Sequence, residues 1–425
     1  MAAASALAQQ TPSNPWAPTG YLNRRLPKWL SFSGELRPRA EGFQNGSFTE
    51  GRDDAYFLNR FRLNMNVTPA WWMKFSFQGQ DARIAWNDIA VKAPPNYDPM
   101  DLRIGYLELG DVEKTWLTAR LGRQELNFGE ERLLGSFGWS NVSRSFDAVR
   151  LTLRHKGYRL DAFAASVVQL SDQQFNKSQT GDNMHGMYGQ IADLIPDSTL
   201  EPYAFWRVAP SVKAEDATPG KLDLKTFGVR WFGKLPASFD YNLEAARQIG
   251  SWSKDRIGGW GLHARLGHNF PARYSPRLAV EYNHGSGDSN PSDGKHETFD
   301  VLYPTGHDKY GLADQVGWKN MHHIGNVFEF LPIRKLRTQV KYHNWWVAST
   351  KDGIYAPNGA LRVKPPAGPA PSHIGQELDL QVIYPITPKV VAWAGVGHIF
   401  PGGYLEKATP GAGYTFPYTM LVWTF

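Results

Sequence analysis

The feature that most constrains this chain is a strict alternation of apolar and polar residues along much of its length. In residues 57–67, for example, Phe61 and Leu63 alternate with Arg60 and Arg62. The same alternation occurs in residues 71–80, 146–155, 335–346 and 377–384. Successive side chains of a β-strand point to opposite faces. The pattern therefore predicts strands that have one apolar face and one polar face.

Applied to the whole chain, this pattern predicts about 18 strands. They are expected at residues 29–37, 56–67, 70–80, 102–109, 116–126, 146–155, 157–168, 184–193, 200–209, 222–232, 240–250, 259–268, 276–284, 321–330, 335–347, 373–384, 388–399 and 416–425. The alternation is weakest in 184–193 and 200–209. An even number of this size is typical of the β-barrels of bacterial outer membranes.

The connections between these strands alternate in length. Thr68-Pro69 and Lys156-Gly157 are tight turns, whereas the segments 38–55, 81–101, 127–145, 285–320, 348–372 and 400–415 are long and polar. A membrane barrel has short turns at one rim and longer loops at the other. The rhythm thus predicts an all-β fold, a transmembrane antiparallel β-barrel with both termini at the periplasmic rim. We expect residues 29–425 to form this barrel as one domain.

Composition narrows the classes of protein further. No apolar stretch reaches the roughly 18–20 residues that a membrane-spanning helix needs, and a closed barrel is the other way to cross a bilayer. Cysteine is absent, which excludes disulfides and cysteine metal sites. The net charge is only +6 without a lysine-rich tract, so we expect no nucleic-acid partner.

Aromatic residues are abundant, with 16 Trp, 18 Tyr and 23 Phe. Six tryptophans near strand ends are expected to form the interfacial girdles of a barrel, namely Trp71, Trp72, Trp231, Trp345, Trp346 and Trp423. A secreted carbohydrate-binding β protein would also be rich in aromatic residues and alternating strands. That alternative stays open at this stage, and a need for detergent would separate the two.

Both chain ends carry signals of export. Ala6-Leu7-Ala8 resembles the small-residue end of a secretory signal, so residues 1–28 are expected to be a signal-peptide remnant and an N-terminal tail. The last strand alternates and ends on Phe425, which is similar to the assembly signal of outer-membrane proteins. We therefore expect the bacterial outer membrane as location, with its lipids and its barrel-assembly machinery as partners.

The polar faces of the strands are expected to line the lumen. The candidate pore-lining and substrate-binding residues are Arg37, Arg60, Arg62, Lys74, Glu108, Arg150, Arg154, Arg159, Arg230, Glu244, Arg265, Arg277, Arg337, Lys341, Glu377 and Asp379. Basic groups outnumber acids on these faces, and a channel with low-dielectric walls focuses such a field on anions. Arginine also grips carboxylates with two parallel hydrogen bonds. A network of ion pairs that only stiffens the wall is the competing interpretation.

Catalytic chemistry finds little support in the sequence. There is no H-E-x-x-H zinc motif and no G-x-S-x-G nucleophile elbow. The pair Glu130-Glu131 lies in an expected loop and would suit a lyase or hydrolase only if it were aimed at a groove. We expect a protein that is not an enzyme, with no catalytic residue, no cofactor and no metal site.

Several stretches resemble the alginate-export family of outer-membrane proteins. They are RLGRQELNFGEERLLG (120–135), WSNVSRSFDAVRL (139–151), FDVLYPTGHDKYG (299–311), YHNWWVAS (342–349), HIGQELDL (373–380) and GHIFPGGYL (397–405). The resemblance covers the chain from about Trp29 to its end. It implies a passive, monomeric channel for an anionic polysaccharide or related sugar acids.

Two departures from the family pattern bear on how open the channel is. The long periplasmic connection of the known exporter is here only Pro385–Pro388, and its long acidic second outer loop is replaced by the weakly acidic residues 81–101. Both obvious plugs are missing, so we expect an intact protein that conducts ions. A general or substrate-specific uptake porin is the alternative function. The loop 285–320 is long enough to fold inward, and the sequence leaves that open.

Overall fold

The computed structural model describes residues 18–111, 113–214 and 217–425. The part of the expected signal-peptide remnant that falls on residues 1–17 lies outside these ranges. The described chain begins with a short helix, α2 (Pro18–Asn23), which precedes the first strand. The side chain of Asn23 holds that strand through its amide, which accepts a hydrogen bond of 2.8 Å from the backbone N–H of Phe32.

Within the described residues, eighteen strands pair antiparallel with their neighbours along the chain. They are β1 (Leu30–Phe43), β2 (Asp54–Ala70), β3 (Met73–Ala85), β4 (Asp98–Leu109), β5 (Leu117–Gln124), β6 (Phe146–His155), β7 (Tyr158–Gln169), β8 (Lys177–Ala192), β9 (Ser198–Lys213), β10 (Pro219–Leu235), β11 (Phe239–Trp252), β13 (Trp260–Asn269), β14 (Arg277–Gly285), β16 (Met321–Phe330), β17 (Arg337–Trp346), β20 (His373–Thr387), β21 (Val390–Pro401) and β22 (Tyr414–Thr424). Strand β22 pairs with β1 and closes the barrel. The predicted fold class is confirmed, including the two weakest strands.

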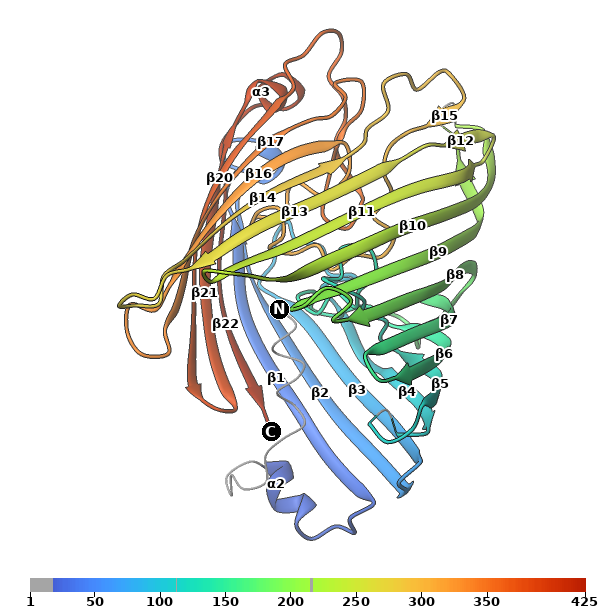
Figure 1. The fold of residues 1–425 in the computed structure, drawn as a ribbon. Helices are drawn as coiled ribbons and strands as arrows, with labels where there is room; N and C mark the ends of the chain where they lie inside the picture. The colour runs from blue at the N-terminus through green and yellow to red at the C-terminus, as the bar shows by residue number, and fades with distance from the viewer. Residues whose placement is uncertain (1–17, 112, 215–216) are drawn as a thin grey trace.

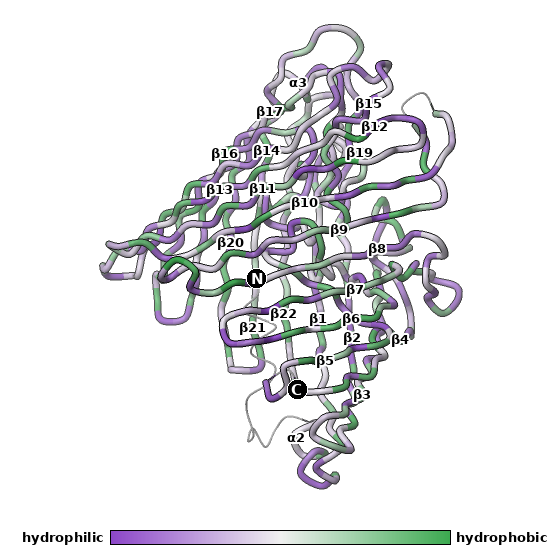
Figure 2. The backbone as a smooth tube through the Cα atoms, turned by 45° about the vertical axis from the view of Figure 1, so that its right-hand side comes forward, coloured by the Kyte–Doolittle hydropathy of each residue, from purple (hydrophilic) through white to green (hydrophobic). Residues whose placement is uncertain are grey.

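Exposure alternates along the strands as the hydropathy pattern predicts. Leu380 is 46% exposed whereas its neighbour Asp379 is 1% exposed, and Val149 and Leu151 are likewise exposed on the outer face. Figure 2 shows hydrophobic and hydrophilic residues alternating along the strands. The apolar row thus faces outward, as a barrel in lipid requires. A soluble sandwich would bury it, so the carbohydrate-binding alternative does not fit.

Some strands extend further than the sequence pattern predicts. Strand β1 continues to Phe43 because Arg39 and Glu41 both point inward, where they form an ion pair of 2.9 Å. Their outward neighbours, Ala40 and Gly42, are small. Without large apolar residues on the outer face, the segment looks like a polar loop in sequence. The register with β2 nevertheless holds over its full length.

The rims of the barrel differ as predicted. Short turns join β2 to β3, β6 to β7 and β20 to β21 at one rim, which lies at the lower end of the red and blue strands in Figure 1. The C-terminus lies at this rim too. The opposite rim carries the long loops, which include β12 (Asp255–Ile257), β15 (Lys295–His296), β18 (Ile354–Tyr355), β19 (Leu361–Val363), the 3₁₀ turn η2 (Gly46–Phe48) and the helix α3 (Gly403–Ala408). No helix in the described ranges is long and apolar enough to span a membrane.

Trp345 corrects the predicted girdle. It is fully buried, and its indole N–H donates a hydrogen bond of 2.9 Å to the carbonyl of Tyr310 inside the barrel. The register of β17 places Trp345 on the same inward face as Lys341 and His343. By contrast, Trp71 is exposed at the turn rim as expected.

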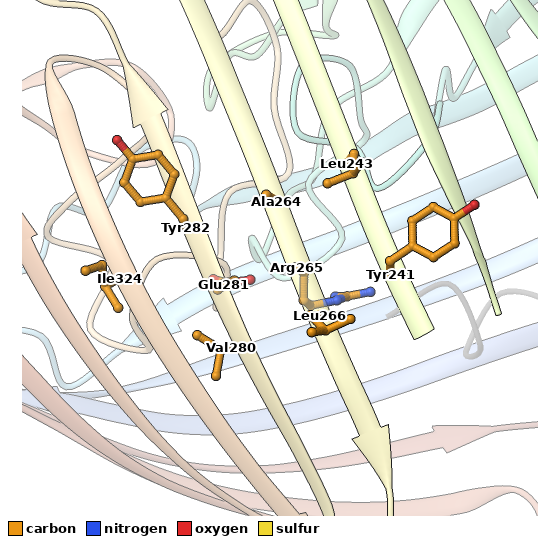
Figure 3. A pocket seen from close by; sticks show the side chains of 9 residues that line it. All are labelled: Tyr241, Leu243, Ala264, Arg265, Leu266, Val280, Glu281, Tyr282 and Ile324. Atoms are coloured by element: carbon orange, nitrogen blue, oxygen red, sulfur yellow. The ribbon is translucent and has the colours of Figure 1, made fainter. Parts of the chain in front are cut away.

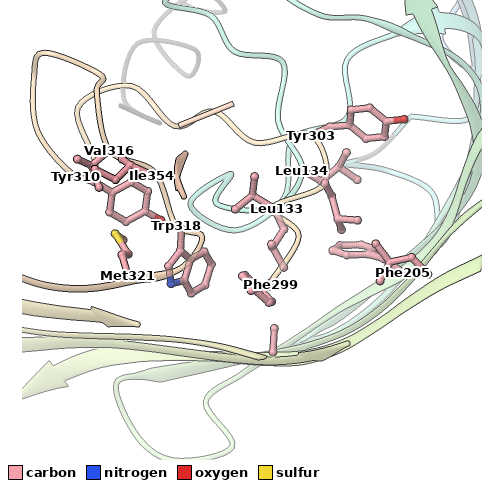
Figure 4. Close-up of a cluster of buried hydrophobic side chains, with 14 of the residues drawn as sticks. Leu133, Leu134, Phe205, Phe299, Tyr303, Tyr310, Val316, Trp318, Met321 and Ile354 are labelled. Carbon is pink, nitrogen blue, oxygen red and sulfur yellow. The ribbon is translucent and has the colours of Figure 1, made fainter. Parts of the chain in front are cut away.

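Two long connections fold into the barrel interior. We call residues 125–145 the inner loop and residues 286–320 the capping loop. Leu133 and Leu134 of the inner loop pack in one buried cluster with Phe299 and Trp318 of the capping loop. Figure 4 shows these side chains gathered on one side of the barrel strands, among the coil segments of the two loops. The interior is therefore a packed core at this level, and the loss of the family's plugs does not leave an unobstructed lumen.

The outer surface offers a direct test of the barrel's orientation in lipid. Replacing Leu380 by Arg near the middle of β20 should cost roughly 2–4 kcal/mol of unfolding free energy, because a charge is then placed against lipid tails. The control is Leu235→Arg at the turn end of β10, where the expected cost is about 0–1 kcal/mol. Reversible unfolding in lipid vesicles measures both. Equal costs would contradict this orientation.

Candidate functional site

All sixteen predicted lining residues have the inward strand parity. They do not, however, share one environment. Arg37, Arg60, Arg62, Arg230, Glu244, Lys341, Glu377 and Asp379 are buried beneath the two loops or beside them. Lys74, Glu108, Arg150, Arg154, Arg159, Arg277 and Arg337 lie nearer the turn rim and are more accessible, and Arg265 lies between the two groups. Sequence alternation gives the face of a residue but not whether a loop covers it.

The arginines of β1 and β2 bind the backbone of the inner loop. Arg37 donates to the carbonyls of Gly138 at 2.9 Å and Ser140 at 3.0 Å. Arg60 donates to the same two carbonyls at 3.0 and 2.9 Å and pairs with Glu35 at 2.7 Å. Two guanidinium groups thus converge on oxygen atoms of one loop. Loop carbonyls are the closest partners of Arg37, whereas Arg60 binds both these carbonyls and the carboxylate of Glu35.

Neighbouring contacts fix the same segment. Arg39 donates to the carbonyl of Trp139 at 2.6 Å and lies 4.2 Å from the centre of its ring. Arg62 donates to the hydroxyl of Ser143 at 2.9 Å. The ring of Trp139 stacks on His307 of the capping loop at 3.8 Å. The two loops therefore hold each other in place as well as the wall.

A second group of positive charges surrounds Glu130 of the inner loop. The carboxylate lies 3.2 Å from Arg265, 3.1 Å from Arg132 and 3.8 Å from Arg230, and it accepts a hydrogen bond of 2.6 Å from the amide of Asn242. Burial by itself would raise the pKa of Glu130, but Arg132 and Arg265 hold that pKa well below its ordinary value. Glu130 is therefore ionised, and it is bound as an anion.

The capping loop is tied to β17 and β20. The ammonium of Lys341 pairs with the carboxylate of Asp308. Burial by itself would raise the pKa of Asp308, but the positive charge of Lys341 lowers it below its ordinary value. The backbone N–H of Ala313 donates to Glu377 at 2.8 Å, and that of Leu312 donates to Asp379 at 3.1 Å. Three of the predicted lining residues thus anchor this loop.

The residues near the turn rim form cross-strand ion pairs. Glu108 pairs with Arg120, while Arg150 and Arg159 both bind Asp161, at 2.9 and 2.7 Å. The other pairs are Arg154 with Glu113, Arg277 with Asp240 and Arg337 with Glu329. Lys74 is the cross-strand neighbour of Glu108. The ion-pair network that the sequence allowed is therefore present among these residues.

Sequence reasoning missed a chain of buried histidines. Asn283 joins His263 at 2.7 Å and His323 at 2.8 Å, and His323 contacts His343 at 2.9 Å. His343 lies 3.3 Å from Asp379. Each histidine is on a different strand, so no spacing in the sequence announces the set. No group of three or more metal-binding side chains in the described ranges could hold a metal ion.

A shallow apolar hollow lies on the barrel wall outside this interior. Its lining is drawn in Figure 3 and comprises Tyr241, Leu243, Ala264, Arg265, Leu266, Val280, Glu281, Tyr282 and Ile324. Leu243, Leu266 and Val280 are exposed outward, where lipid is expected. It is a feature of the outer face and does not belong to the candidate site.

Comparison with known proteins settles the family. The sequence model described as alginate export matches residues 28–417, which is nearly the whole chain. The chain belongs to the alginate export family. Family membership and the closed barrel make this protein a channel of the bacterial outer membrane. No curated protein matches the sequence.

Solved structures share the fold of this alginate export family member. OccK5 (OpdH) of Pseudomonas aeruginosa has a TM-score of 0.62 at 11% identity, over 93% of this chain and 98% of that one. OpdQ of Pseudomonas aeruginosa has the same TM-score at 13% identity, with the same coverage. OccAB2 of Acinetobacter baumannii has a TM-score of 0.60 at 12% identity, over 93% and 98%. At these identities the likeness establishes the barrel fold alone.

The burial of wall residues beneath the loops can be measured by the reactivity of single introduced cysteines, because the native chain has no cysteine. Arg337→Cys should react rapidly with a water-borne thiol reagent, since the Arg337 side chain is 49% exposed. Lys341→Cys should react at least about tenfold more slowly, because the Lys341 side chain is 6% exposed beneath Asp308. Leu378→Cys, facing lipid, is the control that should stay unmodified. Equal rates at Arg337 and Lys341 would contradict an inward capping loop.

Proposed function

We propose that this member of the alginate export family is a passive channel selective for anions, and that sugar acids or an anionic polysaccharide are its solutes. The proposal includes no catalytic step. Export of a polymer and uptake of small sugar acids use the same lining, so a substrate-specific uptake porin is kept as the alternative.

The observation that carries the proposal is the convergence of inward arginines with too few acids to neutralise them. Arg37 and Arg39 lie on β1 and Arg60 and Arg62 on β2, all inward and buried. Arg39 and Arg60 pair with Glu41 and Glu35, whereas Arg37 donates to loop carbonyls and Arg62 to the side chains of Gln80 and Ser143. An anion that replaced those carbonyls would gain charge-assisted hydrogen bonds, which are stronger than bonds between neutral groups. A cation would meet repulsion in the same place.

Acidic residues between the arginines favour passage of an anion over its tight binding. Asp161 lies between Arg150 and Arg159, and Glu108 faces Arg120. Conduction requires sites that bind an ion weakly enough to release it. A uronate moving along this wall would exchange one arginine for the next while the acids limit its residence. The same reasoning suits a small carboxylate and a polyuronate chain.

Selectivity is tested by the reversal potential across a lipid bilayer with a potassium chloride gradient. The unmodified protein should reverse near the chloride potential. Arg154→Glu with Arg159→Glu should shift the reversal toward potassium, most strongly at low salt, because the screening length is ~10 Å at 0.1 M and longer below it. The control is Lys335→Glu in the turn between β16 and β17, which makes the same type of charge change outside the lumen. Potassium preference in the unmodified protein would overturn the proposal.

Two further partners are proposed from position. The apolar outer face of the strands contacts outer-membrane lipids, and the closing strand β22 with Phe425 is recognised by the barrel-assembly machinery. The backbone N–H of Phe425 donates to Gly34 at 3.0 Å, so the terminal residue completes the seam with β1. Truncation of Phe425 should lower the yield of folded barrel in cells, measured by the heat-dependent shift on a denaturing gel.

A further inference from the structure

The inner loop binds the wall as a ligand would. Oxygen atoms of residues 138–141 and the hydroxyl of Ser143 accept hydrogen bonds from the guanidinium groups of Arg37 and Arg60. At its other end the loop presents a carboxylate, that of Glu130, to Arg230 and Arg265. Oxygen atoms of one loop thus contact both groups of inward arginines, Arg37 and Arg60 at one end and Arg230 and Arg265 at the other.

The wall around Glu130 is built from adjacent strands. Arg230 on β10 donates to the amide oxygen of Asn242 on β11 at 3.2 Å, which turns the amide nitrogen of Asn242 toward the carboxylate. Arg265 on β13 is the cross-strand neighbour of Asn242. His263, also on β13, lies 3.9 Å from the carboxylate. These four residues belong to strands of the barrel wall, whereas Arg132 belongs to the inner loop with Glu130.

Among the described residues, Glu130 is the one acid within ion-pair distance of Arg265. Arg230 differs, because it also pairs with Glu201 at 2.7 Å. Glu244 lies on the same wall but its carboxylate binds the hydroxyl of Tyr203 at 2.9 Å. Removal of Glu130 therefore exposes one guanidinium, one amide N–H and part of a second guanidinium. That set matches the carboxylate of a sugar acid.

We propose that Glu130 is a built-in substitute for a solute carboxylate, and that a sugar acid binds to Arg230, Asn242 and Arg265 only when Glu130 leaves with the inner loop. The site rests on the anion-channel function proposed above and adds a defined subsite and an opening step to it. Solute and loop compete for the same wall, so binding of one favours release of the other.

Competition makes a quantitative prediction. Where the binding-competent state is a minor one, the apparent affinity falls by its fractional population. Glu130→Gln removes the competing charge, so glucuronate should block the chloride current at a concentration lower by about tenfold. The matched control is Glu131→Gln, which removes the same charge from the next residue. Glu131 binds Thr305 and does not contact Arg230 or Arg265, so the control should keep the unmodified sensitivity.

The wall residue is tested in the same assay. Arg265→Gln should weaken the glucuronate block whether or not Glu130 is present, and the double variant should lose the gain of Glu130→Gln. Glucose, which has a similar ring and no carboxylate, should not block any of these proteins. An unchanged block in Glu130→Gln, or an equal gain in Glu131→Gln, would overturn the proposal.

Displacement of the inner loop can also be measured without changing a charged residue. Leu133 lies on the inner loop and is buried, so Leu133→Cys reports on release of the loop. Glucuronate should increase its rate of modification by a water-borne thiol reagent, and glucose should not. No increase with glucuronate would contradict displacement of the loop. Failure of the channel function itself would appear separately, as cation preference of the unmodified protein.

Discussion

Replacing residues 299–318 by a short Gly-Ser linker should raise the single-channel conductance several-fold. This segment of the capping loop contributes Phe299, Tyr310 and Trp318 to the buried cluster, and it carries the Asp308 that holds Lys341. Without it the interior loses packed side chains that exclude water, and ions gain a wider aqueous path. Planar bilayer recording at fixed salt measures the change.

The control for this deletion is a loop of the same rim that stays outside. Residues 364–369, between β19 and β20, are largely exposed. Shortening them should leave the conductance within about twofold of the native value, because mobile outer loops tolerate such changes. A capping-loop deletion that conducts no better than this control would show that the restriction lies elsewhere.

Arg60→Ala should cause the largest loss of stability among the charged positions, about 3 kcal/mol of unfolding free energy. The substitution leaves the partly buried Glu35 without its closest cation and leaves the carbonyls of Gly138 and Ser140 short of a donor. Breaking one partner of a buried pair typically costs ~3–5 kcal/mol, and the partial exposure of Glu35 reduces that figure.

The matched comparison is Arg337→Ala. Arg337 also pairs with a glutamate, Glu329 at 2.5 Å, but its side chain is half exposed. Exposed pairs contribute up to about 1 kcal/mol, so this variant should unfold close to the native protein. Denaturant unfolding in lipid vesicles compares the two. Equal losses would mean that Arg60 is not anchoring the inner loop.

The barrel itself was predictable because one physical rule governs every strand. A strand between lipid and interior needs apolar side chains on its lipid face and can carry polar ones on its inner face, so alternation marks each strand. The rule fails where the outer residues are small, as at Ala40 and Gly42, and β1 is therefore longer than predicted. The girdle prediction, which used only position near a strand end, misplaced Trp345, although alternation puts this residue on the inward face with Lys341 and His343.

The interior charges were predictable in kind but not in use. Alternation placed Arg37, Arg60 and Lys341 on the inward face, as the structure has them. It could not pair Arg60 with carbonyls of residues 138 and 140, about eighty positions away. Such contacts depend on where a long loop lies, and a polar loop outside the barrel has much the same composition as one inside.

The sequence by itself therefore determined the strand pattern, the two kinds of rim and the charge of the inward face, because each follows from the local period of the chain. Only the tertiary structure decided that the inner and capping loops enter the barrel and that Glu130 meets Arg230 and Arg265. Those contacts join residues from β10 and β13 with a loop a hundred or more positions earlier in the chain. Their free energy comes from burial and paired charge in three dimensions, which no periodicity along one chain records.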